Sequence, residues 1–169
     1  YDALVTDYWP EFGQAGKEQT RVRDLLAHRA GLSAPREDLS PADILDWETV
    51  TGMLAAQEPL WQPGSGYTYH AITYGWLIGE VIRRVAGESV GAFFARTVTA
   101  PLGADAWIGL PAAEEPRVAL SRVGPTLREL TELQIRAAPA GIECAGRAVA
   151  LSAVLPRGIW PGQHERHLA

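Results

Sequence analysis

Residues 61–77, which read WQPGSGYTYHAITYGWL, decide how the rest of this sequence is interpreted. The pair Pro63 and Gly64 predicts a turn, because proline fixes one backbone angle and glycine tolerates the next. A short aromatic run, extended like a strand, follows over residues 67–70, and a long apolar helix comes directly after it. Tyr69 is therefore expected where a strand-like segment meets a helix N-terminus. Backbone N–H groups point outward there without partners, so a phenol at this place can face a cleft.

This arrangement resembles the second motif of the serine beta-lactamase and penicillin-binding-protein superfamily, in particular its class C branch and the esterase relatives of that branch. In that motif, Pro-Gly and a short spacer precede Tyr-x-Asn, which opens a helix with a Gly-Leu-Leu-Gly-like run. Here the matching residues are Tyr69, His70 and Ala71, and the helix continues as YGWLIG over residues 74–79. Lactamases usually carry Asn where this sequence has Ala71. The resemblance therefore implies an esterase-like relative, with Tyr69 catalytic and Ala71 at the substrate.

Two further segments resemble the same superfamily and occur in the same order. Residues 23–32, RDLLAHRAGL, resemble its Leu-Leu-x-His-x-x-Gly-Leu segment, and residues 101–109, PLGADAWIG, resemble its Pro-Leu-Gly-Met segment. We therefore expect one partial domain over residues 1–169, with a family-like part over residues 20–111. The resemblance implies structural roles near the site for four residues: His28, Gly31, Pro63 and Gly64. For the histidine, that role is a hydrogen bond to backbone that braces the following loop.

Composition narrows the function classes. The chain has 169 residues, enough for one domain with a core, and a net charge of −5 with no basic stripe, which disfavours nucleic acid as a partner. Its single cysteine, Cys144, cannot form an internal disulfide and is expected to be buried. No run is long and apolar enough to span a bilayer, and no signal peptide is visible. Because the sequence opens at Tyr1 within what reads as an ongoing segment, we expect a longer gene product, and we leave the compartment open.

The predicted fold class is α+β, mainly α: the helical lobe of a beta-lactamase-like serine hydrolase with few short strands. Helices are expected in six places: over residues 23–29, from Ser40, over 47–57, over 72–85, from Ser89 and over 143–155. Other expectations are an extended arm, two strands and a disordered tail: residues 1–12, 106–110, 118–123 and 157–169. Thr20 is predicted to cap the first helix and Gly31 to end it. Charged residues of helix 72–85, Glu80 among them, are placed on its solvent side.

The nucleophile of the superfamily is absent from the sequence. Its Ser-x-x-Lys motif puts serine and lysine one helical turn apart, so that the lysine helps to take the serine proton. The single lysine here is Lys17, and the residue three before it is Gln14. The third motif, Lys-Thr-Gly or His-x-Gly, is absent too. Tyr69 is thus the one catalytic element of three, implied to act as base or proton relay. A free phenol titrates near pH ~10, so it would need a positive neighbour, which the missing lysine supplies in the superfamily.

Other readings of these residues remain. Tyr69 taken alone is a tyrosine packed in an aromatic turn, and His70 is expected in a solvent or core contact on the opposite side. Ser65 does not fit the Gly-x-Ser-x-Gly elbow of α/β-hydrolases. His164 and His167 fall short of a zinc motif. No metal or cofactor is implied.

We therefore expect a fragment of an enzyme whose partner is a small-molecule ester or amide, cleaved through an acyl-serine. This chain by itself is expected to show no turnover. The alternative is a non-catalytic binding module, or an inactive truncated product, of the same fold. A helical lobe without its sheet would also expose an apolar face, so we expect self-association.

Overall fold

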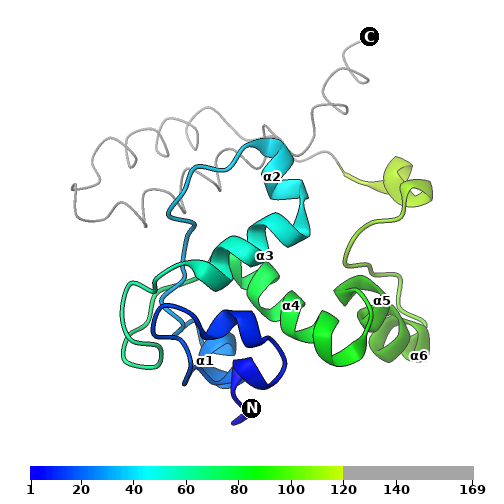
Figure 1. Ribbon diagram of the computed structural model, residues 1–169. Coiled ribbons are helices and arrows are strands. Elements are labelled where there is room, and N and C mark those ends of the chain that lie inside the picture. Colours follow the sequence, from blue (N-terminus) through cyan, green and yellow to red (C-terminus); the bar gives the residue numbers. More distant parts are fainter. Residues whose placement is uncertain (120–169) are drawn as a thin grey trace.

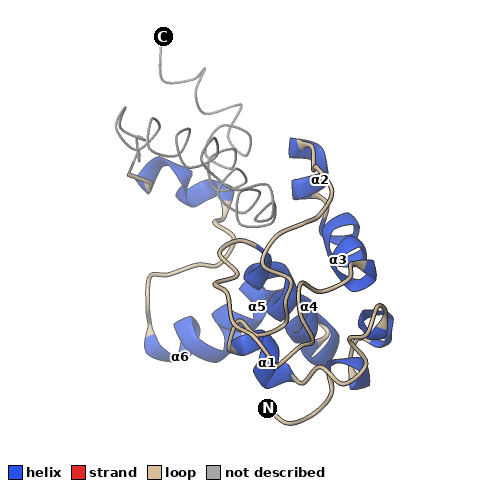
Figure 2. Cartoon of the chain, turned by 90° about the vertical axis from the view of Figure 1, so that its left-hand side faces the viewer, coloured by secondary structure: helices blue, strands red, loops and turns tan. Residues whose placement is uncertain are grey.

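The computed structural model describes residues 1–119, and in this part the chain is helical (Figure 1). Its elements are, in order, η1 (Val5–Asp7), η2 (Pro10–Gly13), α1 (Val22–Leu26), α2 (Pro41–Leu45), α3 (Trp47–Ala56), α4 (Thr73–Ala86), α5 (Val90–Phe94), η3 (Ala95–Thr99), α6 (Ala100–Leu102) and η4 (Ala112–Arg117). Over residues 1–119 the β-pairing consists of one isolated antiparallel bridge, between Leu4 and Arg21. Figure 2 accordingly shows helices and loops in this region. The helix-rich part of the predicted fold class is confirmed, and its β part is not.

The core lies between α4, α3 and the N-terminal turns. Figure 1 shows α3 and α4 crossing at the centre, with η1, η2 and α1 beside them. Eleven buried side chains form the cluster: Val5, Trp9, Phe12, Leu25, Ala30, Leu32, Val50, Leu54, Ala55, Leu77 and Val81. The extended arm predicted over residues 1–12 is therefore wrong. Val5, Trp9 and Phe12 are spaced by four and three residues, the period of one helical face, and short 3₁₀ turns bury all three.

Two predicted helix starts, at Ser40 and Ser89, are confirmed by their N-caps. The Ser40 hydroxyl accepts a hydrogen bond from the Asp43 amide (3.2 Å), and the Asp43 carboxylate accepts one from the Ser40 amide (2.8 Å). Ser89 caps α5 by accepting from Ala92 N–H (3.2 Å). The helix of residues 90–102 passes through a π-helical turn, η3, before it ends at left-handed Gly103.

The limits predicted for the first helix are wrong. Its N-cap is Arg21, whose amide donates to the Asp24 carboxylate at 3.0 Å, whereas Thr20 lies buried. The helix ends at Leu26, because His28 already has a positive φ of 58°. Gly31 lies beyond the helix, and two features require glycine there: its φ of 74°, and a Cβ that would lie 2.9 Å from the Trp61 carbonyl oxygen.

The strand predicted over residues 106–110 is also wrong. The segment is irregular, and the backbone at Ile108 lies so close to α5 that it would contact any Cβ placed on Gly91. Residues 106–110 therefore pack against α5 and do not pair with another strand. Most of the strand predicted over residues 118–123 lies outside the described residues. So do Cys144, both tail histidines, the helix predicted over residues 143–155 and the tail.

Glu80 corrects the expected solvent side of α4. Its side chain is 1% exposed and accepts hydrogen bonds from Trp47 Nε1 (2.7 Å), Arg83 Nε (2.8 Å) and Arg84 Nε (2.6 Å). The two arginines continue outward to Glu48 and Glu11, at 3.0 and 2.9 Å. Buried ion pairs are tolerated when each charge is paired and hydrogen-bonded, and this one joins α4 to α3 and η2.

No helix among residues 1–119 combines the length and the hydropathy that crossing a membrane would need.

Candidate functional site

The segment that leads into α4 places Tyr69 and His70 on opposite sides. Tyr69 is 62% exposed, whereas the His70 side chain is 1% exposed. Extended backbone turns successive side chains to opposite faces, so this alternation arises even though residues 67–70 do not pair as a strand. The phenol is thus open to solvent just before the first residue of α4, Thr73.

Two histidines hold this segment to the loop after α1. Leu32 N–H donates to His70 Nε2 at 3.1 Å, and the backbone N–H of His70 donates to His28 Nδ1 at 3.2 Å. His70 Nδ1 lies 2.6 Å from the Thr68 carbonyl oxygen. Burial lowers the pKa of His70, and the nearby His28 adds to that shift, while the bond to Thr68 opposes it. His70 is therefore neutral at pH 7.

The ring of His28 lies among aromatic side chains. Its centroid is 4.6 Å from that of Tyr74, 4.9 Å from that of Tyr69 and 6.3 Å from that of Tyr67. Within residues 1–119 no hydrogen bond is made to the Tyr69 hydroxyl, so among these residues the phenol is held by its ring contact with His28 and by its backbone.

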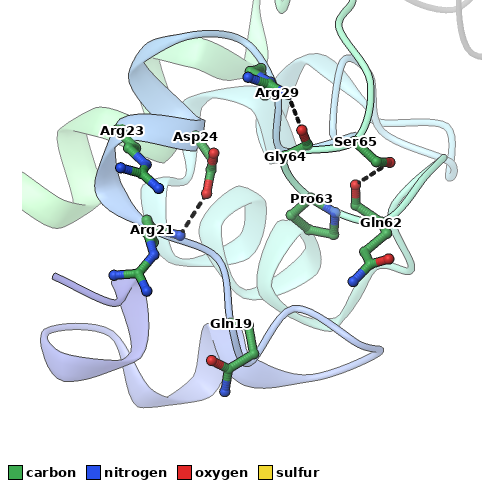
Figure 3. Close-up of a pocket in the computed structure, with 9 residues that line it drawn as sticks. All are labelled: Gln19, Arg21, Arg23, Asp24, Arg29, Gln62, Pro63, Gly64 and Ser65. Carbon is green, nitrogen blue, oxygen red and sulfur yellow. Dashed lines mark hydrogen bonds between the residues drawn. The ribbon is translucent and has the colours of Figure 1, made fainter. Parts of the chain in front are cut away.

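The turn residues lie at a different feature, a surface pocket of about 520 Å³ (Figure 3). Nine residues line it: Gln19, Arg21, Arg23, Asp24, Arg29, Gln62, Pro63, Gly64 and Ser65. Gly64 has a φ of 86°, and its N–H donates to the Arg29 carbonyl oxygen at 3.0 Å. In Figure 3 the Arg29 guanidinium reaches back to the Gly64 carbonyl oxygen. The turn is therefore tied to the chain just after α1.

The structure thus brings some predicted site residues together and leaves others apart. His28 contacts Tyr69, and Gly31 lies on the loop that His70 holds. Pro63 and Gly64 line the pocket, whereas Tyr69 and Ala71 do not. Ala71 is exposed two residues before α4 and offers only a methyl group. The sequence analysis did not single out His70 for this site. The one sequence feature that indicated its burial is its place next to Tyr69 in extended backbone, where successive side chains point to opposite faces.

Metal ligands do not gather in the described region: no group of three or more His, Cys, Asp or Glu side chains is placed to hold an ion among residues 1–119.

Comparisons with known proteins agree with these motifs. The family model described as Beta-lactamase matches residues 1–156. The chain is 37% identical over 150 residues to "Esterase/beta-lactamase LipL" of Mycobacterium tuberculosis, covering 89% of this chain and 33% of the relative. It is also 27% identical over 111 residues to a "Putative D-alanyl-D-alanine carboxypeptidase" of Salmonella agona, covering 59% of this chain and 26% of the relative.

Solved structures give the same picture. A family VIII carboxylesterase superposes with a TM-score of 0.68 at 50% identity, over 70% of this chain and 33% of the other. A penicillin-binding-protein homologue from Caulobacter crescentus gives 0.68 at 47% identity, over 72% and 33%. The chain therefore spans about a third of the length of these relatives.

Proposed function

Since this chain belongs to the beta-lactamase family, a family of serine hydrolases, we propose that it is part of an enzyme that cleaves carboxylic esters through an acyl-serine, with Tyr69 as its proton-transfer residue. One observation carries the proposal. Tyr69 occupies the tyrosine position of the motif, is open to solvent, and is held beside α4 by the ring of His28.

The reaction requires a nucleophile that these 169 residues do not contain, because no serine stands three residues before the single lysine. In the proposed reaction, a serine Oγ supplied by the rest of the enzyme attacks the ester carbonyl carbon and loses its proton to the Tyr69 phenolate. The tetrahedral intermediate collapses, and the leaving alkoxide takes that proton from the phenol. A water molecule then repeats the two transfers and releases the acid, which leaves serine and tyrosine as they began.

Ala71 supports an ester over a lactam as substrate. An asparagine amide at this position can hydrogen-bond the amide group of a lactam, whereas a methyl group cannot. Esters do not need that donor. We therefore expect Ala71→Asn to raise the ratio of lactam to ester hydrolysis in an enzyme that contains this chain, measured as kcat/KM for the two substrates. An unchanged ratio would argue against a substrate contact at Ala71.

The direct experiment is a chimaera. The matching third of the 50%-identical family VIII carboxylesterase is replaced by this chain, and hydrolysis of a p-nitrophenyl ester is measured. We expect turnover by the chimaera and none by the 169-residue chain alone. A folded chimaera without turnover, or a chain that hydrolyses the ester by itself, would contradict the proposal.

A second candidate function is a non-catalytic binding module built on the same fold, and the absence of Ser-x-x-Lys from this chain favours it. The two differ in the coding sequence: a Ser-x-x-Lys helix encoded in frame just upstream supports the enzyme, and a native start codon immediately before Tyr1 supports the module.

A further inference from the structure

We propose that His70 and His28 are positioning residues for Tyr69: as a pair of neutral imidazoles in one fixed set of tautomers, they hold the backbone on both sides of Tyr69 and so set where its phenol lies. The inference rests on the proposed function in one respect: that function makes the position of the phenol important for catalysis.

The backbone around Tyr69 is fixed on both sides by these two rings. On the C-terminal side, His70 N–H donates to His28 Nδ1 at 3.2 Å. On the N-terminal side, the Thr68 carbonyl oxygen lies 2.6 Å from His70 Nδ1. The far nitrogen of the same ring, Nε2, accepts from Leu32 N–H at 3.1 Å. One imidazole therefore joins both sides of Tyr69 to a loop 38 residues earlier in the chain.

These contacts leave one choice of tautomer for each ring. Because Leu32 N–H points at His70 Nε2, that nitrogen carries no proton, and the ring proton lies on Nδ1, where it is donated to the Thr68 carbonyl oxygen. Because His70 N–H points at His28 Nδ1, the proton of neutral His28 lies on Nε2. A second proton on either ring would set two N–H groups against each other.

The same two rings also position the phenol and the start of α4. His28 has a φ of 58°, a left-handed conformation that turns its ring back between Tyr69 and Tyr74. The Thr73 hydroxyl donates to the Leu32 carbonyl oxygen at 2.6 Å, on the residue whose N–H is bound by His70. The loop after α1, the segment before α4 and the first residue of α4 thus form one connected unit.

Hydrogen bonding and simple packing predict opposite results for two substitutions at His70. In His70→Gln the side-chain oxygen can reach the place of Nε2 and accept from Leu32 N–H, although the side chain fills less space. In His70→Leu an apolar side chain fills a buried site but offers no acceptor. If positioning depends on the hydrogen bond, the glutamine variant keeps Tyr69 in place and the leucine variant does not; if the site only needs filling, the order is reversed.

The experiment is NMR on the full 169-residue chain. ¹⁵N-histidine spectra at pH 7 are expected to show the proton of His70 on Nδ1 and that of His28 on Nε2. The nuclear Overhauser contact between the Tyr69 and His28 rings is expected to persist in His70→Gln and to disappear in His70→Leu. The opposite tautomers, a charged ring at pH 7, or a contact that survives only in His70→Leu would overturn the proposal.

A second pair of variants covers the case in which His70→Leu does not fold. His28→Asn keeps an acceptor near the place of Nδ1 and suits the left-handed backbone, whereas His28→Ala removes the acceptor. We expect the His70 amide to exchange slowly in His28→Asn and at least tenfold faster in His28→Ala; equal rates would overturn the proposal. These readouts do not involve catalysis. A chimaera in which Tyr69→Phe changes nothing would overturn the proposed function and leave the result for the two histidines standing.

Discussion

The Glu80 carboxylate is the group that joins α4 to α3, through its hydrogen bond from Trp47 Nε1. Burial alone would raise the pKa of Glu80, but the hydrogen bonds from Arg83, Trp47 and Arg84 lower it to about 2. The folded pKa lies below the ordinary 4.5, so the stabilisation is complete above about pH 5 and is lost as the pH falls toward 2. Glu80→Gln leaves two arginines facing an uncharged group, and we expect it to lower the free energy of unfolding at pH 7 by about 3 kcal/mol.

Chemical denaturation at several pH values tests this prediction. The control is Glu48→Gln, which removes an exposed carboxylate from the same Arg83 and is expected to cost about 0.5 kcal/mol. The difference between wild type and Glu80→Gln should shrink as the pH falls from 5 to 3. Equal effects of the two substitutions at pH 7 would show that the Glu80 network is not stabilising.

Lys17 carries a second prediction at the residue scale. It is fully buried, and its Nζ donates to the carbonyl oxygens of Gln14 (2.7 Å) and Gln57 (2.5 Å). Burial lowers the pKa of Lys17 from 10.5 to about 8, partly opposed by Glu18. Between these values the unfolded chain holds a proton that the folded chain has released, so stability rises with pH. The two N–H bonds of a neutral amine still serve both carbonyl oxygens.

The comparison for Lys17 is with Lys17→Met, because the tyrosines that titrate in the same range are common to both proteins. From pH 8 to pH 10, we expect the free energy of unfolding of the wild type to rise relative to that of the variant. Parallel pH profiles would contradict the buried position of Lys17.

These residues also show where sequence reasoning stops. The motif around Tyr69 could be read directly, because its chemistry depends on residue order. The burial of Glu80 and Lys17 could not, because their partners lie on other elements: Trp47 and the Gln57 carbonyl oxygen are 33 and 40 residues away. A charged side chain is ordinarily placed in solvent, and only the tertiary contacts overrule that expectation.

At the scale of elements, the close contact of α4 with α3 depends on the absence of a side chain at Gly79. A Cβ there would lie 2.5 Å from the Trp47 ring, which Glu80 holds by its Nε1 and which therefore cannot move aside. We expect Gly79→Ala to lower the free energy of unfolding by about 1–3 kcal/mol. Gly75→Ala, in the same helix with nothing within 4 Å of the added Cβ, is the matched control and should be neutral or stabilising by up to about 1 kcal/mol. Thermal melts that rank the two variants equally would contradict this packing.

The predictions for the elements succeeded where local signals sufficed. Helices α2, α3, α4 and α5 follow from caps and apolar periodicity. Their starts, and the ends of α3 and α4, fall within a residue of expectation. The two segments predicted as an arm and as a strand failed for one cause. Residues 1–12 and 106–110 are short segments whose conformation is set by what they pack against, the core in the first case and α5 in the second.

At the scale of the whole molecule, η3, α6 and the loop after α6 expose several apolar side chains, here called the η3–α6 face. Its exposed residues are Val98, Leu102, Trp107, Ile108 and Leu110. Since Leu102 is 74% exposed and the other four side chains are 37–50% exposed among residues 1–119, we expect the isolated chain to associate with itself. Sedimentation velocity should show a mass that rises with concentration and falls in Leu102→Ser.

The matched control for the η3–α6 face is Leu45→Ser, which removes a leucine of similar exposure on α2, at a separate place in Figure 1. It should leave the association unchanged. A wild-type chain that stays monomeric over the whole concentration range would contradict the expectation.

The proton-transfer role of Tyr69 is tested most directly by the kcat of the carboxylesterase chimaera that carries Tyr69→Phe. The control is the chimaera with Tyr67→Phe, because Tyr67 is also exposed and its ring lies farther from His28. We predict a loss in kcat of about 10²-fold or more for Tyr69→Phe and little change for Tyr67→Phe. Equal kcat values for the two variants would contradict the assignment of Tyr69 as the proton-transfer residue.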